Sequence, residues 1–183
     1  MGIVVGIVAI TLAIWLMLAF NRLIRLRNQY RTAWADIDVQ LQRRHDLVPQ
    51  LVEAVRGYAK HERATLEAVT ELRTQAKAAQ GMQRQGEVET QLEQALTRLI
   101  ALQEAYPELK ASGNFQQLSS GLVTVEDHLQ YARRFYNGAV RDYNDTIQRF
   151  PDLLIARVFG FRGSEFFQAD AGSQAAPKVE LGP

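Results

Sequence analysis

The sequence contains no cysteine and only three histidines, so several classes of functional site are excluded at once. Without cysteine there are no disulfides, no thiolate metal sites and no cysteine that a lipid could acylate. The histidines His45, His61 and His128 are too far apart to present two ligands on one helix face. No glutamate precedes a histidine by three residues, which a di-iron bundle site requires. Phosphate-loop and serine nucleophile motifs are also missing from the sequence. We therefore predict no catalytic, cofactor-binding or metal-ligating residue, and a protein that is not an enzyme.

Charge is missing from residues 1–20, where only Gly2, Gly6 and Thr11 interrupt an apolar run. As a helix, a run of this length spans ~30 Å, the thickness of the hydrocarbon core of a bilayer. A cleaved signal peptide would carry positive charge before the apolar stretch and small residues after it. Neither is present, and bulky Phe20 ends the run. Residues 1–21 are therefore predicted to be an uncleaved transmembrane anchor.

Positive charge follows the apolar run immediately, on its C-terminal side. Because such charge is retained in the cytoplasm, we expect a single span in the inner membrane, an outward N-terminus and a cytoplasmic soluble domain. The arginines that follow the apolar run would bind anionic lipid headgroups, each contributing about 1 kcal/mol of binding free energy near the surface. Beyond Arg31, a solvated helix face explains the basic residues equally well. The formal net charge of +1 provides no overall field for nucleic acid. The predicted membrane-surface residues are Arg22, Arg25, Arg27 and Arg31.

Beyond the anchor, apolar residues recur in steps of three and four, which is typical of helices with one buried face. No segment alternates like a strand. The clearest stripe runs from Phe115 to Phe150 and has the spacing of a helix in a left-handed bundle. The third helix is predicted over about 87–105, after a polar loop at 81–86, and Pro107 is expected to end it. The fold class is therefore predicted to be all-α.

Pro49 leaves the topology open, because proline inside a helix removes a hydrogen bond but is tolerated in a first turn. Asp46 would be a good N-cap for a new helix starting here. If the chain folds back at Pro49, an antiparallel up-and-down bundle of four helices results, and this arrangement is favoured. If Pro49 only kinks the helix, the bundle has three helices and a long first one. Residues 22–168 are predicted to form the bundle domain, and the Gly-, Ala- and Pro-rich residues 169–183 a disordered tail.

The densest polar cluster lies just before Pro49. Arg44 falls on the apolar seam between Leu41 and Val48. It could be a buried cation poised for a ligand or partner, but an ion pair inside the bundle is the favoured interpretation. We predict that Arg44 faces a carboxylate on another helix, with Glu126 as the candidate. The residues from which an interaction site would be built are Arg44, His45, Asp46 and Glu126.

Two Tyr-Asn pairs, Tyr136-Asn137 and Tyr143-Asn144, lie one heptad apart on the Phe115-to-Phe150 stripe. A tyrosine on a seam is more often a core residue with a hydrogen-bonded hydroxyl than a ligand contact, and Tyr143 is predicted to be core. The asparagines beside the tyrosines are candidates for fixing helix register.

A series of motifs in one order resembles the bacterial LemA family over about residues 21–168. The resemblance implies a single-span membrane protein with an antiparallel helical bundle; it implies no reaction and no catalytic residues. The motifs are Asn28-Gln29-Tyr30, Ala33-Trp34, Ile37 to Leu41, Arg43 to Pro49, Leu51-Val52-Glu53, Gly57-Tyr58-Ala59, His61-Glu62, Tyr106 to Lys110, Asn114-Phe115, Tyr136-Asn137, Tyr143-Asn144, Phe150-Pro151 and Phe159-Gly160-Phe161.

These observations favour a membrane-anchored helical-bundle scaffold or assembly protein that works by protein–protein or membrane-surface binding, without a cofactor. The alternative is a regulatory subunit of a membrane-associated enzyme complex. The expected partners are the lipid bilayer, a protein that the sequence does not name, and a second copy of the chain. Nucleic acid is not expected.

Overall fold

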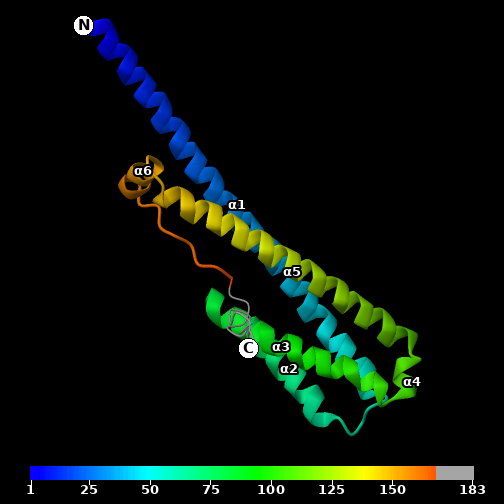
Figure 1. Ribbon diagram of the computed structural model, residues 1–183. Coiled ribbons are helices and arrows are strands. Elements are labelled where there is room, and N and C mark those ends of the chain that lie inside the picture. Colours follow the sequence, from blue (N-terminus) through cyan, green and yellow to red (C-terminus); the bar gives the residue numbers. More distant parts are fainter. Residues whose placement is uncertain (168–183) are drawn as a thin grey trace, which may run out of the picture. The chain divides into compact units, whose positions relative to one another are not determined.

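The computed structural model describes residues 1–167 and is helical almost throughout, with no strand in this range. The all-α prediction is confirmed, whereas the predicted disordered tail at 169–183 lies outside the described residues. Figure 1 shows the order of the elements along the chain. The helices are α1 (Gly2–Arg56), α2 (Arg63–Ala78), α3 (Met82–Ala101), the 3-10 turn η1 (Leu102–Glu104), α4 (Pro107–Lys110), α5 (Gly113–Gln148) and α6 (Asp152–Val158).

Helix α1 continues through Pro49, so the predicted break at this proline is wrong. The favoured bundle of four helices is nevertheless present, because the chain turns back a little later. Proline lacks the N–H that would bind the carbonyl of His45, four residues earlier. The Arg73 Nε on α2 donates a hydrogen bond to this carbonyl oxygen at 2.7 Å. Because another helix replaces the missing donor, the helix can continue, and the chain turns back at residues 57–62 instead.

The connection between α2 and α3 is shorter than predicted. Gly81 has a positive φ of 82°, which glycine adopts without strain, and α3 begins at the next residue. Gly86 therefore lies inside α3 and not in a loop. Pro107 occupies the first turn of α4, where its missing N–H has no helical partner to lose.

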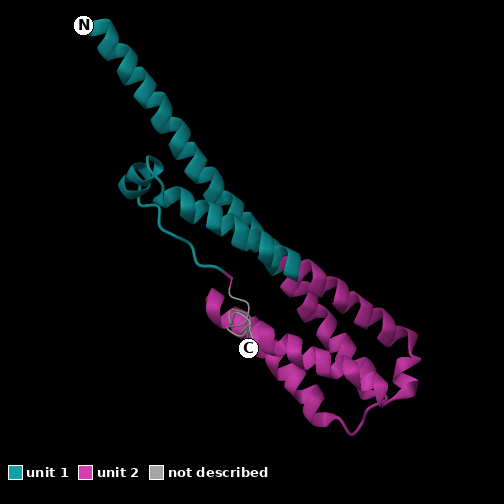
Figure 2. Cartoon of the chain, in the orientation of Figure 1, with its two compact units in different colours: residues 1–38, 130–166 teal, residues 39–129, 167–183 magenta. Residues whose placement is uncertain are grey.

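The described chain divides into two compact units, coloured in Figure 2. We call residues 1–38 with 130–166 the anchor unit, and residues 39–129 with Phe167 the bundle unit. Helices α1 and α5 each contribute residues to both. The domain limits expected from the sequence stay a prediction.

The bundle unit contains four antiparallel helical segments, from α1, α2, α3 and α5 (Figure 1). The short connections between α1, α2 and α3 make consecutive helices antiparallel neighbours. Their inward faces form an apolar core that α4 also joins. This core includes Val48, Leu51, Val55, Val69, Val88, Leu92, Leu99, Leu109, Phe115 and Leu122.

In the anchor unit, α1 and α5 run antiparallel with aromatic residues along the seam. The Tyr30 and Tyr143 rings lie 5.1 Å apart between centroids, and those of Trp34 and Tyr136 lie 5.4 Å apart. At one end of this seam α6 closes a small core with Leu23. The unit therefore depends on side chains from distant parts of the sequence.

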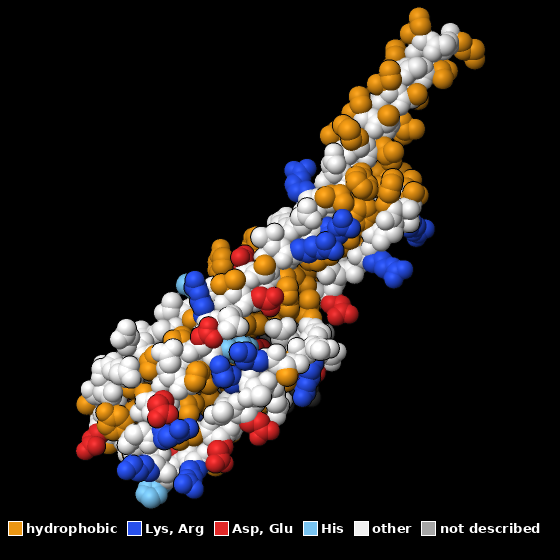
Figure 3. All heavy atoms as spheres, turned by 180° about the vertical axis from the view of Figure 1, so that it is seen from behind, with side chains coloured by type: hydrophobic (Ala, Val, Ile, Leu, Met, Phe, Trp, Pro, Cys, Tyr) orange, Lys and Arg blue, Asp and Glu red, His pale blue; other side chains and the backbone are white. Residues whose placement is uncertain are grey.

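The first part of α1 is apolar yet lacks protein cover. Its large apolar side chains from Ile3 to Leu18 are mostly exposed, and Figure 3 shows them along this helix. The helix is long and apolar enough to cross a membrane. Since exposing so much apolar surface to water is costly, the observation agrees with the predicted anchor.

Candidate functional site

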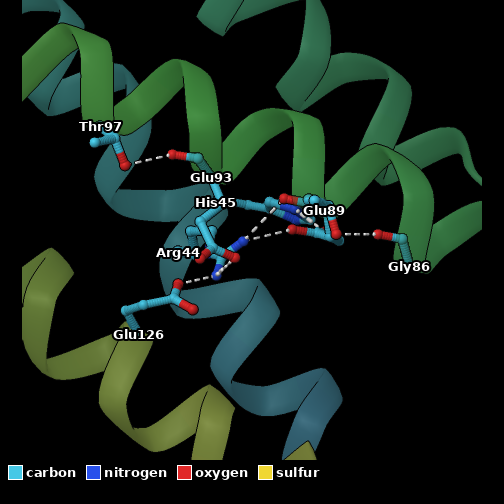
Figure 4. Close-up of polar contacts among 8 residues, drawn as sticks. Arg44, His45, Gly86, Glu89, Glu93, Thr97 and Glu126 are labelled. Atoms are coloured by element: carbon cyan, nitrogen blue, oxygen red, sulfur yellow. Dashed lines mark hydrogen bonds and ion pairs between the residues drawn. The ribbon is translucent and has the colours of Figure 1, made fainter. Parts of the chain in front are cut away.

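Arg44 lies fully buried inside the bundle unit, surrounded by carboxylates from two other helices (Figure 4). Its Nη1 lies 3.1 Å from Glu89 Oε2 and also donates to the Glu89 backbone oxygen at 3.4 Å. Its Nη2 forms an ion pair with Glu126 of α5 and lies 4.0 Å from Glu93 Oε2 of α3. One guanidinium thus joins α1 to both α3 and α5.

His45 extends this cluster from the next position of α1. Its Nε2 lies 2.7 Å from Glu89 Oε1, so Glu89 contacts both basic residues with its two carboxylate oxygens. Glu89 is fully buried and His45 nearly so. A carboxylate in such a place requires charged or hydrogen-bonding partners, which these two residues supply.

Arg44 was predicted to be partly buried and is fully buried, and its predicted pairing with Glu126 is confirmed. Glu89 was missed, although it lies within the helix predicted over about 87–105. The signal was present: Glu89 precedes Leu92 by three residues, Leu92 precedes Leu96 by four, and the same seam then reaches Leu99. When each of two helices carries a charged residue on its buried seam, the two charged side chains are expected to contact each other.

Asp46 does not join the cluster. It is exposed in the middle of α1 and accepts a hydrogen bond from Gln42 Nε2 at 2.8 Å. It is no N-cap, because no helix begins here.

A cavity of about 100 Å³ adjoins the cluster and is lined by Arg44, Glu93 and Glu126 on one side. Its remaining walls are largely aliphatic and include Leu96 and Leu122. Pockets for organic ligands usually measure roughly 300–1,000 Å³. The geometry is that of opposite charges paired between helices, with little room for a substrate.

The tyrosines of the two Tyr-Asn pairs, Tyr136 and Tyr143, are buried in the anchor unit, and Tyr143 is a core residue as predicted. The Tyr136 hydroxyl donates to the Glu165 backbone oxygen, and the Tyr143 hydroxyl to that of Arg162, both at 2.9 Å. Burial is the largest cause that raises the pKa of each phenol above its ordinary value.

The asparagines of this group make different contacts. Asn144 bonds both the backbone N–H and the backbone oxygen of Ser164 at 2.9 Å. It therefore fixes the segment after α6, and the role of the asparagines in helix register stays a prediction. Asn137 is half-buried and also makes interactions of its own.

The four arginines after the apolar run are not equivalent. Arg22 Nη1 lies 3.4 Å from Asp152 Oδ2 at the start of α6. The Arg27 guanidinium carbon lies 5.2 Å from the centre of the Phe161 ring, in a cation–π contact. Arg25 and Arg31 are exposed. Their binding to lipid headgroups stays a prediction.

Comparison with known proteins adds to this geometry. A family model described as LemA family matches residues 33–181, which include the Arg44 cluster and both Tyr-Asn pairs. The chain belongs to the LemA family. The resemblance seen in the sequence motifs is thereby confirmed.

Individual relatives are distant. The magnetosome protein MamQ 2 of Paramagnetospirillum magneticum is 24% identical over 179 residues, covering 84% of this chain and 66% of the relative. MamQ of Magnetospirillum gryphiswaldense is 22% identical over 178 residues, with coverages of 83% and 65%. LemA of Metamycoplasma hominis is 26% identical over 150 residues, with coverages of 81% and 68%. This chain thus spans slightly less than two thirds of the length of the MamQ proteins.

LemA membership and the exposed apolar α1 together make this a membrane-associated protein. None of the names of these relatives states a reaction. The site must therefore be interpreted from its own chemistry.

Proposed function

We propose that this LemA-family chain is a membrane-anchored scaffold or assembly protein that acts by binding, not by catalysis. The observation that carries the proposal is the Arg44 cluster, the densest polar constellation in the described part of the chain. Its guanidinium is bound by Glu89 and Glu126, and the adjoining cavity is small. Such a cluster stabilises and specifies a bundle, and a rigid bundle suits the presentation of a surface to a partner.

A candidate protein-binding face lies on α5 within the anchor unit. Tyr131 and Phe135 are one helical turn apart and both largely exposed. Aromatic side chains are enriched among the residues that carry most of the energy of protein–protein interfaces. An adjacent exposed aromatic pair therefore suits a protein partner, including a second copy of this chain.

Site-specific photo-crosslinking in intact cells tests this face. A photoreactive phenylalanine analogue replaces Tyr131 or Phe135, and in the control it replaces Arg141, which is exposed on the same helix. We expect discrete crosslinked bands at the aromatic positions only, which mass spectrometry then identifies. A band at twice the mass indicates self-association, and capture of an enzyme subunit favours the regulatory alternative. Equal, diffuse crosslinking at all three positions would overturn the assignment of this face.

We also propose that the anchor spans the inner membrane with the bundle unit in the cytoplasm. The arginines that follow residue 20 support this orientation. Alkaline phosphatase fused after Pro183 should be inactive, because the enzyme folds only after export, while a fluorescent protein fused there should be bright. High phosphatase activity would reverse the orientation.

A further inference from the structure

The short helix α6 in the anchor unit exposes apolar side chains in a regular pattern. Leu154 and Val158 are four residues apart in the helix, which places them on one face. Phe150 lies just before the helix. The exposed fractions of Leu154, Val158 and Phe150 are 53%, 79% and 74%, and the neighbouring Phe159 is also more than half exposed. Apolar side chains gathered in this way mark an interaction surface.

The depth of this face relative to the membrane follows from its contacts with the end of the transmembrane segment. The Phe159 ring lies 4.9 Å from that of Phe20, between centroids, and the Phe161 ring lies 5.8 Å from it. Phe20 is the last residue of the uncharged run. Trp15, five residues deeper in the anchor, packs against the same core as α6. Side chains that cover the end of a transmembrane segment share its depth, so α6 lies at the boundary between hydrocarbon and headgroups.

The charges around α6 suit the same boundary. Asp152 is the only acidic residue between 149 and 162, and it is buried against Arg22. Arg149 and Arg157, close to these apolar residues in the sequence, are exposed. Figure 3 shows hydrophobic side chains gathered near the base of the anchor helix with basic side chains beside them. An apolar face bordered by arginine and free of exposed acid fits a surface of lipid phosphates.

We propose that residues 150–159, the α6 foot, lie in the headgroup layer of the bilayer with Leu154 and Val158 directed toward the acyl chains. The occupant of this surface is lipid. The chain is thus held at the membrane by a second element beside its transmembrane helix, and the anchor unit is seated on the bilayer instead of tethered above it. This inference rests on contacts within the anchor unit and is independent of the proposed scaffold function.

The absence of cysteine permits a direct test with the full chain in vesicles of phosphatidylcholine and phosphatidylglycerol. Leu154→Cys and Val158→Cys carry a polarity-sensitive fluorophore. Asp142→Cys, exposed on α5 in the same unit, and Lys77→Cys on α2 are the matched controls. Because all four side chains are exposed, the circular dichroism spectra should be unchanged.

We expect blue-shifted emission at positions 154 and 158, strong quenching by lipids that carry a nitroxide on the acyl chain, and protection from aqueous iodide. The controls should show the reverse. Emission and iodide quenching at 154 and 158 equal to those at 142 would overturn the proposal. A blue shift that disappears on dilution with excess lipid, without quenching by nitroxide lipid, would also overturn it, because a second copy would then cover the face.

Discussion

The bundle unit and the anchor unit both bury polar side chains on helix seams, but they satisfy them with different chemistry. In the bundle unit the Arg44 guanidinium contacts carboxylates, and Glu89 is as deeply buried as Arg44. In the anchor unit, neutral phenols on α5 donate to backbone oxygens of the segment after α6. One seam therefore depends on buried ion pairs and the other on single hydrogen bonds.

This difference predicts which substitutions should most destabilise each unit. Removing one member of a buried ion cluster leaves the other charges without compensation, which usually costs more than the pair itself contributed. Removing a phenolic hydroxyl leaves one carbonyl oxygen unpaired, a smaller loss. Variants in the two units should therefore separate into large and small effects even when all affected residues are equally buried.

The largest effect is expected from Arg44→Ala, which leaves the buried Glu89 carboxylate without its guanidinium. The loss should be about 3–5 kcal/mol of unfolding free energy. Urea denaturation of the full chain in detergent, followed by circular dichroism, measures it. Arg43→Ala, exposed one position earlier, is the control and should be nearly neutral.

A second substitution sharpens the assignment of that loss. Glu126→Gln in the Arg44→Ala background should recover part of the stability, because it removes a negative charge that has lost the Arg44 guanidinium. If the two substitutions are simply additive, the Arg44–Glu126 pair contributes no coupling.

Tyr143→Ala tests the packing of the anchor unit and should cost about 3 kcal/mol, as large-to-small changes in a core do. The same denaturation experiment applies. A variant that loses activity in cells while retaining its melting temperature would instead identify Tyr143 as a binding residue.

A medium effect is expected at Pro49, where Arg73 replaces a missing backbone donor. Arg73→Ala should cost about 1–3 kcal/mol, because the His45 carbonyl loses its partner. In a Pro49→Ala background the new N–H can bind this carbonyl, so the cost of Arg73→Ala should fall. An unchanged cost in the double-mutant cycle would show that Arg73 stabilises through packing alone.

The smallest effect is expected from Tyr143→Phe, about 1 kcal/mol for one hydrogen bond. Its pH dependence is more informative. Burial raises the pKa of Tyr143, so the folded protein holds the phenolic proton more tightly than the unfolded chain. The stability contribution is complete below the ordinary tyrosine pKa of 10.0 and is lost as pH rises through the folded-state pKa. Tyr143→Phe should thus lose less stability above pH 10 than the parent chain.

Local patterns were sufficient to predict much of the fold. The stripe from Phe115 to Phe150 predicted α5 to within two residues at each end. Arg44 was recognised because its spacing to Leu41 and Val48 placed a charge where an apolar residue was expected. Periodicity reports which face of a helix is buried, and these inferences required nothing more.

The rest depended on contacts between distant residues. Whether Pro49 ends a helix is decided by Arg73, which lies on another helix and has no recognisable signal in sequence. Glu89 was missed because Val88 and Glu89 are both buried in the helix, and a pattern of apolar residues marks only Val88. The foot at α6 required knowing that Phe159 lies against Phe20.

The small core that joins Leu23 to Tyr143 has a consequence for biosynthesis. The two residues are separated by 120 positions, and a ribosome adds roughly 5–20 residues per second, so about 6–24 s pass between them. During that time the anchor has already emerged, while the α1 seam beyond it has no α5 to cover it. We therefore expect the nascent chain to spend this interval with an apolar seam open at the membrane surface, where an insertase or chaperone would be needed to shield it.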